Sequence, residues 1–352
     1  MHYVILNKDR LDDFVIRLAE FSRVAAPVSK GHGSFAFEYV TSAQAISMTY
    51  IPTILPPKKY FMPQRETLLE FNLGEKSSVE AVADFEAITL FGVHTCDLAA
   101  IQCLNMVFSE RPRDCHYLLR KKHIDLIGFE CNDYCDEYAN CAAMDTHLPA
   151  GGYDLFFSDL GDDFIVDIAT QRGEEIVGKT AVFINANDLH LSALSKLREN
   201  KKSIFKNELA VASKKISDLF DRSFGSTVWK DLQERCLACG NCTAVCPTCY
   251  CFDIRDEIDL DLTSGRRYRI WDSCQLEPFA KVAGGENFRK ERSTRQRHRY
   301  YRKFRYPLDK YGRFFCTGCG RCSRTCMASI RLKETLQALA RESESRIWKG
   351  WL

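Results

Sequence analysis

The sequence predicts a mixed α/β domain over residues 1–215, followed by a mainly helical domain over residues 216–352. In the first part, short apolar runs of strand length alternate with helical patterns, which is typical of α/β layers. In the second part, segments of helical periodicity flank two copies of a four-cysteine motif, and the last of them is an amphipathic closing helix with Leu332, Leu336 and Leu339 on one face. The chain has 352 residues, of which 45% are hydrophobic, so each part can bury a core of its own.

The first 71 residues predict a strand and a helix, followed by short strand-like pieces. Over residues 1–25 the apolar side chains of the helix recur at helical spacing, at Leu11, Phe14, Val15, Leu18 and Phe21. From residue 31 onward the pattern changes to strand-like pieces, and the prolines between positions 56 and 63 exclude a long helix. These elements are expected to form the start of the first domain.

The centre of the first domain is predicted to be a buried sheet. Residues 87–93 and 123–131 are apolar runs of strand length, and the segment 94–108 between them has helical periodicity. Residues 151–190 alternate in the manner of strands and complete the sheet. A strand, a helix and a strand in this order favour some parallel pairing.

Four cysteines are placed by this prediction at one edge of the sheet. Cys96 and Cys131 each lie just past the end of a predicted strand, and Cys135 and Cys141 follow Cys131 closely. Ligands of open α/β sheets tend to bind at the carboxyl ends of the strands. The hypothesis is a metal-binding site on these four thiols, and the alternative is that they are buried structural cysteines, which are common.

The second domain carries the strongest motif of the chain, the spacing C-x2-C-x2-C-x3-C. Its first copy is Cys236, Cys239, Cys242 and Cys246, and its second is Cys316, Cys319, Cys322 and Cys326. This spacing is typical of iron–sulfur proteins, and in two-cluster ferredoxins the fourth cysteine binds the other cluster. Paired C-x2-C units also bind zinc, but two four-cysteine copies favour two [4Fe–4S] clusters.

The ferredoxin pattern predicts a crossed set of ligands. One cluster is expected on Cys236, Cys239, Cys242 and Cys326, and the other on Cys316, Cys319, Cys322 and Cys246. Pro247 follows the first motif, whereas Met327 follows the second. The long segment between the motifs favours a helical ferredoxin-like arrangement over the compact ferredoxin fold. The segment also contains Cys249, Cys251 and Cys274, which either pack around a cluster or bind an extra centre together with an outside ligand.

Basic residues accompany these motifs. Residues 289–305 are dense in arginine and lysine, interleaved with aromatic side chains. Since iron–sulfur clusters with their thiolates carry net negative charge, this run is interpreted as neutralising a cluster or an acidic partner, and an RNA-binding arm is the weaker alternative. Lys58, Lys59 and Arg65 form either a basic lip facing an anionic ligand or cluster, or a solvated loop.

The remaining composition narrows the class of protein. There are 17 cysteines, but the N-terminus shows no signal-peptide pattern, which indicates reduced, metal-bound thiols in the cytoplasm. No apolar run is long enough to span a bilayer, so no direct membrane insertion is expected. The formal net charge of +2 gives no sign of nucleic-acid binding by the chain as a whole. Neither a G-x-G-x-x-G fingerprint after a strand nor a P-loop is present, so nucleotide chemistry is expected in another subunit.

With these motifs in view, the chain resembles a known family, the iron–sulfur beta subunits of cytoplasmic nickel–iron sulfhydrogenases and the A subunits of anaerobic sulfite reductases. The stretches that carry the resemblance occur in family order: ILPPKKYFMPQRE, FGVHTCDLAAI, YLLRKKHIDLIGFEC, RCLACGNCTAVCPTCYCFD, RIWDSCQ, VAGGENFR and FCTGCGRC. The chain departs from the family at His94, where the family tends to have arginine, and at Asn140 to Ala142, where it tends to have Cys-Phe-Cys. Cys135 is a candidate for the thiolate missing there, in a third cluster with Cys96, Cys131 and Cys141.

The resemblance implies a non-catalytic iron–sulfur subunit of a multisubunit cytoplasmic oxidoreductase. Such a subunit relays single electrons between a flavoprotein subunit, which binds FAD and NAD(P), and a catalytic metalloenzyme subunit such as a hydrogenase or sulfite reductase. Two alternatives remain at this stage: a self-contained reductase with a substrate site in the first domain, and a nucleic-acid-binding iron–sulfur protein.

Overall fold

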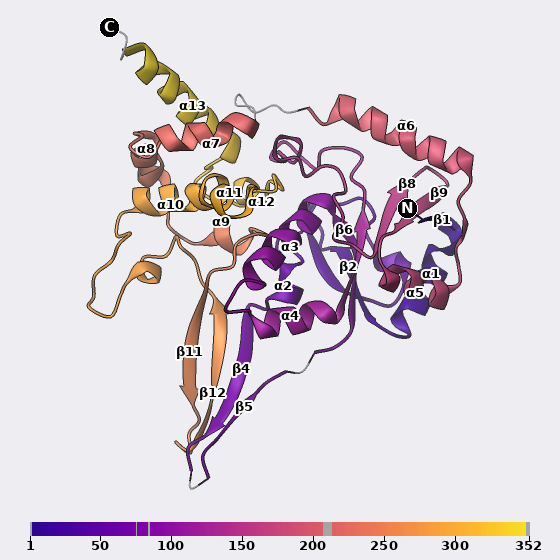
Figure 1. Ribbon diagram of the computed structural model, residues 1–352, viewed down its shortest axis with the longest axis horizontal. Coiled ribbons are helices and arrows are strands. Elements are labelled where there is room, and N and C mark those ends of the chain that lie inside the picture. Colours follow the sequence, from indigo (N-terminus) through magenta and orange to yellow (C-terminus); the bar gives the residue numbers. More distant parts are fainter. Residues whose placement is uncertain (1, 75, 84, 207–212, 350–352) are drawn as a thin grey trace.

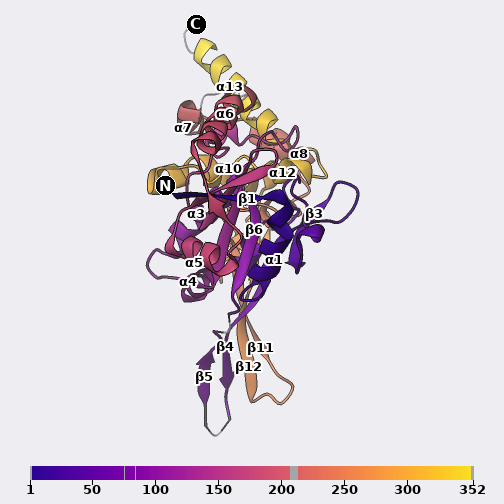
Figure 2. The same ribbon diagram turned by 90° about the vertical axis from the view of Figure 1, so that its right-hand side faces the viewer.

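The computed structural model describes residues 2–349 apart from 75, 84 and 207–212. A large sheet with its helices occupies most of the first half of the chain, and helices with two motif loops occupy most of the second (Figure 1). A smaller sheet projects from one end of the molecule, opposite the C-terminal helix, and a second view shows the same arrangement (Figure 2).

The large sheet has eight strands in the order β10-β1-β9-β8-β7-β6-β2-β3. Their bounds are β1 His2–Asn7, β2 Arg23–Ser29, β3 Phe35–Val40, β6 Ile88–His94, β7 Ile124–Phe129, β8 Leu155–Asp159, β9 Asp163–Ile168 and β10 Ile184–Asn185. The four central strands β2, β6, β7 and β8 pair in parallel, and the outer pairs are antiparallel. The predicted mixed α/β architecture is therefore confirmed.

Helices pack on both faces of this sheet. They are α1 Leu11–Ala19, α3 Thr95–Phe108, α4 Cys115–Lys122, α5 Gln171–Thr180 and α6 Asp188–Ile204. Helix α1 buries Phe14, Val15 and Leu18 in a core on one face, as its periodicity predicted. Helices α3 and α4 pack in a separate core on the other face, through residues such as Leu104 and Tyr117.

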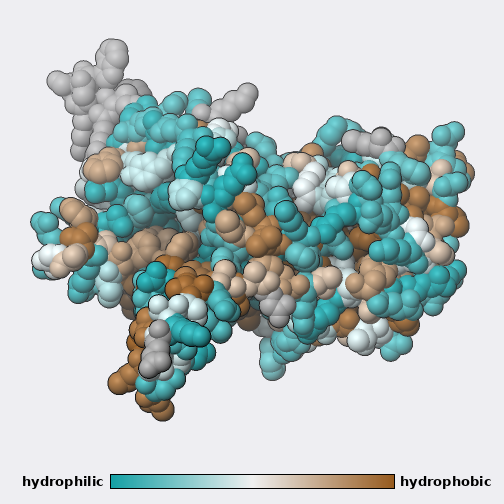
Figure 3. Space-filling view, turned by 60° about the horizontal axis from the view of Figure 1, so that its bottom comes forward, coloured by the Kyte–Doolittle hydropathy of each residue, from teal (hydrophilic) through white to brown (hydrophobic). Residues whose placement is uncertain are grey.

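The small sheet joins the two halves of the chain. Its order is β11-β12-β4-β5, with bounds β4 Arg65–Asn72, β5 Ser78–Ala81, β11 Phe252–Ile258 and β12 Ser264–Trp271. Strand β12 pairs with β4 in antiparallel register, and Arg269 of β12 forms a buried ion pair with Glu66 of β4 at 2.6 Å. Hydrophobic surface gathers at the end of this projection (Figure 3), where Leu260 and Leu262 are exposed. The sequence analysis did not predict the hairpin β11–β12 between the motifs, because its pairing partner β4 lies far away in the sequence.

The helices of the second half surround a core of their own. They are α7 Ser213–Arg222, α8 Val228–Arg235, α9 Asn241–Ala244, α10 Arg292–Phe304, α11 Tyr306–Tyr311, α12 Arg321–Arg324 and α13 Leu332–Lys349. Tyr300 and Phe304 of α10 lie in this core with Leu336 and Leu339 of α13, which confirms the amphipathic closing helix. The second half thus combines helices with one hairpin.

Short helices complete the chain. They are α2 Lys58–Phe61 and the 3-10 turns η1 Lys8–Arg10, η2 Ala43–Ala45, η3 Ala142–Met144 and η4 Pro278–Ala280. Across the residues that the structure describes, no helix combines the length and apolar character that a membrane span requires.

Candidate iron–sulfur sites

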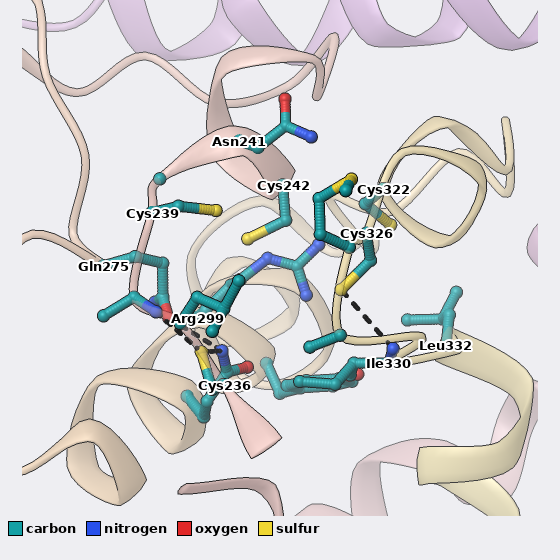
Figure 4. A pocket seen from close by; sticks show the side chains of 17 residues that line it. Cys236, Cys239, Asn241, Cys242, Gln275, Arg299, Cys322, Cys326, Ile330 and Leu332 are labelled. Carbon is teal, nitrogen blue, oxygen red and sulfur yellow. Dashed lines mark hydrogen bonds between the residues drawn. The ribbon is translucent and has the colours of Figure 1, made fainter.

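The first set of cysteines converges on one cavity. Cys236 follows α8, Cys239 precedes α9, Cys242 lies in α9 and Cys326 follows α12. All four line the same space, and Cys322 of the second motif lines it as well (Figure 4). The loop turns at Gly240, which has a φ of +78° and on which a Cβ would lie 3.2 Å from Ser273. Glycine is the residue that adopts this conformation without strain. The structure therefore brings together the four thiols of the crossed assignment.

Hydrogen bonds point at two of these sulfurs. The Gln296 side-chain amide donates to Cys236 Sγ at 2.8 Å, and the Ala238 backbone N–H donates to the same atom at 3.3 Å. The Ile330 backbone N–H donates to Cys326 Sγ at 3.4 Å. Donors aimed at sulfur stabilise the thiolate, which is the form that binds metal, and they tune a bound cluster.

The second set, Cys246, Cys316, Cys319 and Cys322, also comes together. Burial and the neighbouring thiols Cys322, Cys319 and Cys246 raise the pKa of Cys316. Burial raises the pKa of Cys319 to about 11; Cys246 and Cys322 act in the same direction, while Arg321 opposes them. Each thiol disfavours a second negative charge beside it, as expected for groups gathered at one site. A bound cation or metal centre would relieve that repulsion.

Basic side chains of α10 lie between and beside the two sets. Arg299 is buried, and the thiols of Cys242, Cys322 and Cys246 raise its pKa in spite of burial. Lys303, one turn later, is also buried and faces Cys246 among its thiol neighbours. Since buried cations need anionic partners, these two fit negatively charged clusters. Their burial also removes them from a surface that could contact nucleic acid.

The third set gathers at the predicted edge of the large sheet. Cys96 is the second residue of α3, which begins directly after β6, and Cys131 follows the adjacent parallel strand β7. The Cys131 and Cys135 thiols contact each other. This contact raises the pKa of Cys135, and burial and the nearby thiols of Cys96 and Cys141 act in the same direction. The four cysteines are therefore neighbours at this edge of the sheet, and their role as cluster ligands stays a prediction.

The third set lies directly beside the second. Burial and Asp97 raise the pKa of Cys96, and Cys319 of the second motif acts in the same direction. A Cβ on Gly318, at a φ of +65°, would lie 2.3 Å from the backbone of Asn140, so the second motif packs tightly on the loop that carries Cys141. The Asn140 backbone N–H donates to the Gly318 carbonyl at 2.7 Å.

A buried ion pair that sequence reasoning missed lies between these two sets. Arg321 is 0% exposed, and its Nη1 and Nη2 atoms donate to the two carboxylate oxygens of Asp97 at 2.6 and 2.7 Å. Asp97 neighbours Cys96, and Arg321 follows Cys319 by two residues. Nothing in the sequence signals the pair, because its members are 224 positions apart.

The basic lip exists in part. Lys58 is only 3% exposed; its Nζ donates to the Cys249 carbonyl at 2.8 Å and lies 4.1 Å from the centre of the Trp271 ring. By contrast, Lys59 donates to the Phe37 carbonyl, and Arg65 pairs with a glutamate on the exposed small sheet. The interpretation as a solvated loop is therefore wrong for Lys58.

Comparison with known proteins agrees with this geometry. A family model described as a 4Fe-4S dicluster domain matches residues 235–330, which contain both motifs. Fold and site thus define an iron–sulfur protein of the dicluster class.

A more specific relationship follows from a curated relative. Sulfhydrogenase 2 subunit beta of Pyrococcus furiosus is 36% identical over 331 residues, which cover 94% of this chain and 96% of the relative. The chain belongs to the family of sulfhydrogenase beta subunits and is an iron–sulfur electron-transfer subunit. No solved structure matched the chain.

Proposed function

We propose that the chain relays single electrons within a multisubunit cytoplasmic oxidoreductase, between a flavoprotein subunit that binds FAD and NAD(P) and a catalytic metalloenzyme subunit. Residues 1–215 would form its α/β domain, and residues 216–352 a mainly helical ferredoxin-like domain. The observation that carries the proposal is the continuous series of thiol sets: the first meets the second at Arg299, and the second meets the third at Cys96 and Cys319.

In this proposal each set holds a [4Fe–4S] cluster. The first cluster is bound by Cys236, Cys239, Cys242 and Cys326, and the second by Cys316, Cys319, Cys322 and Cys246. The third is bound by Cys96, Cys131, Cys135 and Cys141. When bound, the clusters accept and donate one electron each, and this chain's own residues hold them, exclude water and set their charge environment.

The first cluster would be the contact point for a redox partner. Cys239 is an exposed member of its set, and the apolar side chains of Leu237 and Met327 beside it are 64% and 84% exposed. Exposed apolar groups around a cofactor are typical of a docking surface. The relative's name describes one subunit of a larger enzyme, which supports a partner subunit at this surface.

The test is the cluster count of the chain purified without oxygen. Iron and sulfide are measured per chain, and a dithionite titration is followed by electron paramagnetic resonance. About twelve irons with three reducible clusters would support the full proposal, and about eight would remove the third set from the path. Zinc without labile sulfide would overturn the proposal altogether.

The docking surface is tested separately. Met327→Glu and Leu237→Glu are expected to slow electron transfer from the reduced partner subunit of the native complex while the cluster signals stay unchanged. Ile184→Glu, at a similarly exposed apolar side chain on the edge strand β10, serves as the matched control. Equal rates in all three variants would place the partner elsewhere.

A further inference from the structure

Three cysteines outside the proposed ligand sets meet at the base of the β11–β12 hairpin. Cys251 immediately precedes β11, and Cys274 lies shortly after the end of β12. Phe252 pairs with Trp271, and the Asp272 backbone N–H donates to the Cys251 carbonyl at 2.9 Å, so the hairpin places Cys251 opposite Cys274. Cys249 lies two residues before Cys251. The tertiary fold thus gathers three thiols that are spread over 26 positions of the sequence, from 249 to 274.

The three thiols are close neighbours. The Cys251 and Cys274 thiols contact each other, and Cys249 lies close to Cys251. Cys249 also contacts Cys246, the fourth cysteine of the first motif. These thiols therefore adjoin the second cluster set without belonging to it.

Buried positive charge faces this group from two elements. Lys58 of α2 lies near the thiols of Cys249, Cys246 and Cys251, and Lys303 of α10 lies near those of Cys246 and Cys249. Lys58 Nζ donates to the Cys249 carbonyl at 2.8 Å, Lys303 Nζ donates to the Thr248 hydroxyl at 2.6 Å, and both lysines are at most 5% exposed. A buried ammonium group is costly unless an anion compensates it, and thiolates that hold a cluster here would supply that anion.

Two cavities adjoin the same thiols. One is lined by Cys249 and Cys251 together with Lys58, Trp271 and Asp272. The other is lined by Cys249, Cys251 and Cys274 together with Lys303. The motif cysteines also lie beside buried cations, which are Arg299 and Lys303.

We infer that Cys249, Cys251 and Cys274 bind a further iron–sulfur cluster, distinct from those of the two motifs and of the sheet edge. Three thiolates hold it, and its remaining position is filled by water or by Asp272, which lines the adjoining cavity. The inference rests on the proposed function in one respect, because Cys246 must belong to the second cluster. A cluster with a non-cysteine ligand at one iron loses that iron on mild oxidation and becomes [3Fe–4S], which gives the site its own spectroscopic signature.

The experiment compares the native chain with three variants, all purified without oxygen. The first is the triple variant Cys249→Ser/Cys251→Ser/Cys274→Ser, and the second is Cys131→Ser/Cys135→Ser at the sheet edge. The third is Cys115→Ser, an exposed cysteine away from every set, as the control. Iron and sulfide are counted, and paramagnetic resonance spectra are recorded after dithionite and after mild ferricyanide oxidation.

The triple variant is expected to lose about four irons and the oxidised [3Fe–4S] signal while keeping the dithionite signals of the motif clusters. Loss of the same signal in the sheet-edge variant, or an unchanged iron count in the triple variant, would overturn the inference and leave the proposed function intact. Zinc that is bound by the native chain and lost from the triple variant would also overturn the inference. If the triple variant does not fold, the native chain decides: absence of a [3Fe–4S] signal after oxidation refutes the site.

Discussion

The buried ion pair between Asp97 and Arg321 gives a sharp test of the structure, through the substitution Asp97→Asn. The guanidinium group makes two hydrogen bonds to the carboxylate, at 2.6 and 2.7 Å, and its Nε donates to the Thr53 carbonyl at 2.6 Å. Both side chains are at most 1% exposed. Asparagine keeps the shape but removes the compensating charge, so the free energy of unfolding is expected to fall by about 3–5 kcal/mol.

The assay is an anaerobic urea titration followed by tryptophan fluorescence, with the change in free energy taken from the midpoint. Asp253→Asn breaks an exposed ion pair with Arg255 and serves as the matched control, with an expected cost of about 0–1 kcal/mol. The double variant Asp97→Leu/Arg321→Met replaces the pair with apolar groups and is expected to be much closer to the native chain than Asp97→Asn alone. If Asp97→Asn lowers the free energy of unfolding by no more than Asp253→Asn does, Asp97 is not the group that compensates the buried charge of Arg321.

Three further predictions follow from the same geometry. Gln296→Leu removes the hydrogen bond to Cys236 Sγ. With that bond about 1 kcal/mol stronger in the reduced state, a redox titration should show the reduction potential of the first cluster fall by about 40 mV. An unchanged potential would mean that the bond does not act on the cluster. Gly318→Ala places a Cβ 2.3 Å from neighbouring backbone, whereas the Cβ of Gly312→Ala, at a similar φ, meets open space. Gly318→Ala should therefore lower the free energy of unfolding by at least about 1 kcal/mol more than Gly312→Ala does. Equal effects of the two substitutions would contradict the tight packing. Burial and then Arg289 lower the pKa of His298 to about 4, so on acidification the unfolded chain binds the proton before the folded chain does. Stability should therefore fall as the pH drops from about 6.5 toward 4. His298→Gln should flatten that decline in the urea midpoints, and an unchanged decline would refute the assignment.

Much of the fold was accessible from local patterns. The apolar periodicity of residues 11–21 and of 332–339 predicted two helices that bury those faces. The buried strands 87–93 and 123–131 predicted adjacent parallel pairing, which the register of β6 and β7 confirms. These patterns can be recognised in the sequence because helices and buried strands impose fixed spacings on their own apolar residues.

The hairpin between the motifs was not accessible in that way. Strands β11 and β12 carry many charged side chains, and their pairing depends on β4, whose residues lie nearly 200 positions earlier. A strand whose partner is remote shows no local sign of the pairing, because the energy of the sheet comes from neighbours across strands. The sequence analysis did not predict this hairpin for that reason.

By itself, the sequence determined which thiols can act together within each motif, because the spacing C-x2-C-x2-C-x3-C fixes how closely neighbouring residues of one loop approach. It also indicated the sheet-edge cysteines, because parallel strands end at a common edge. Only the tertiary structure decided which of the many cations are buried beside the thiols, with Lys58, Arg299, Lys303 and Arg321 chosen from 49 lysines and arginines. The physical reason is that burial of a charge depends on the anions that the fold brings around it, and these come from segments distant in the sequence.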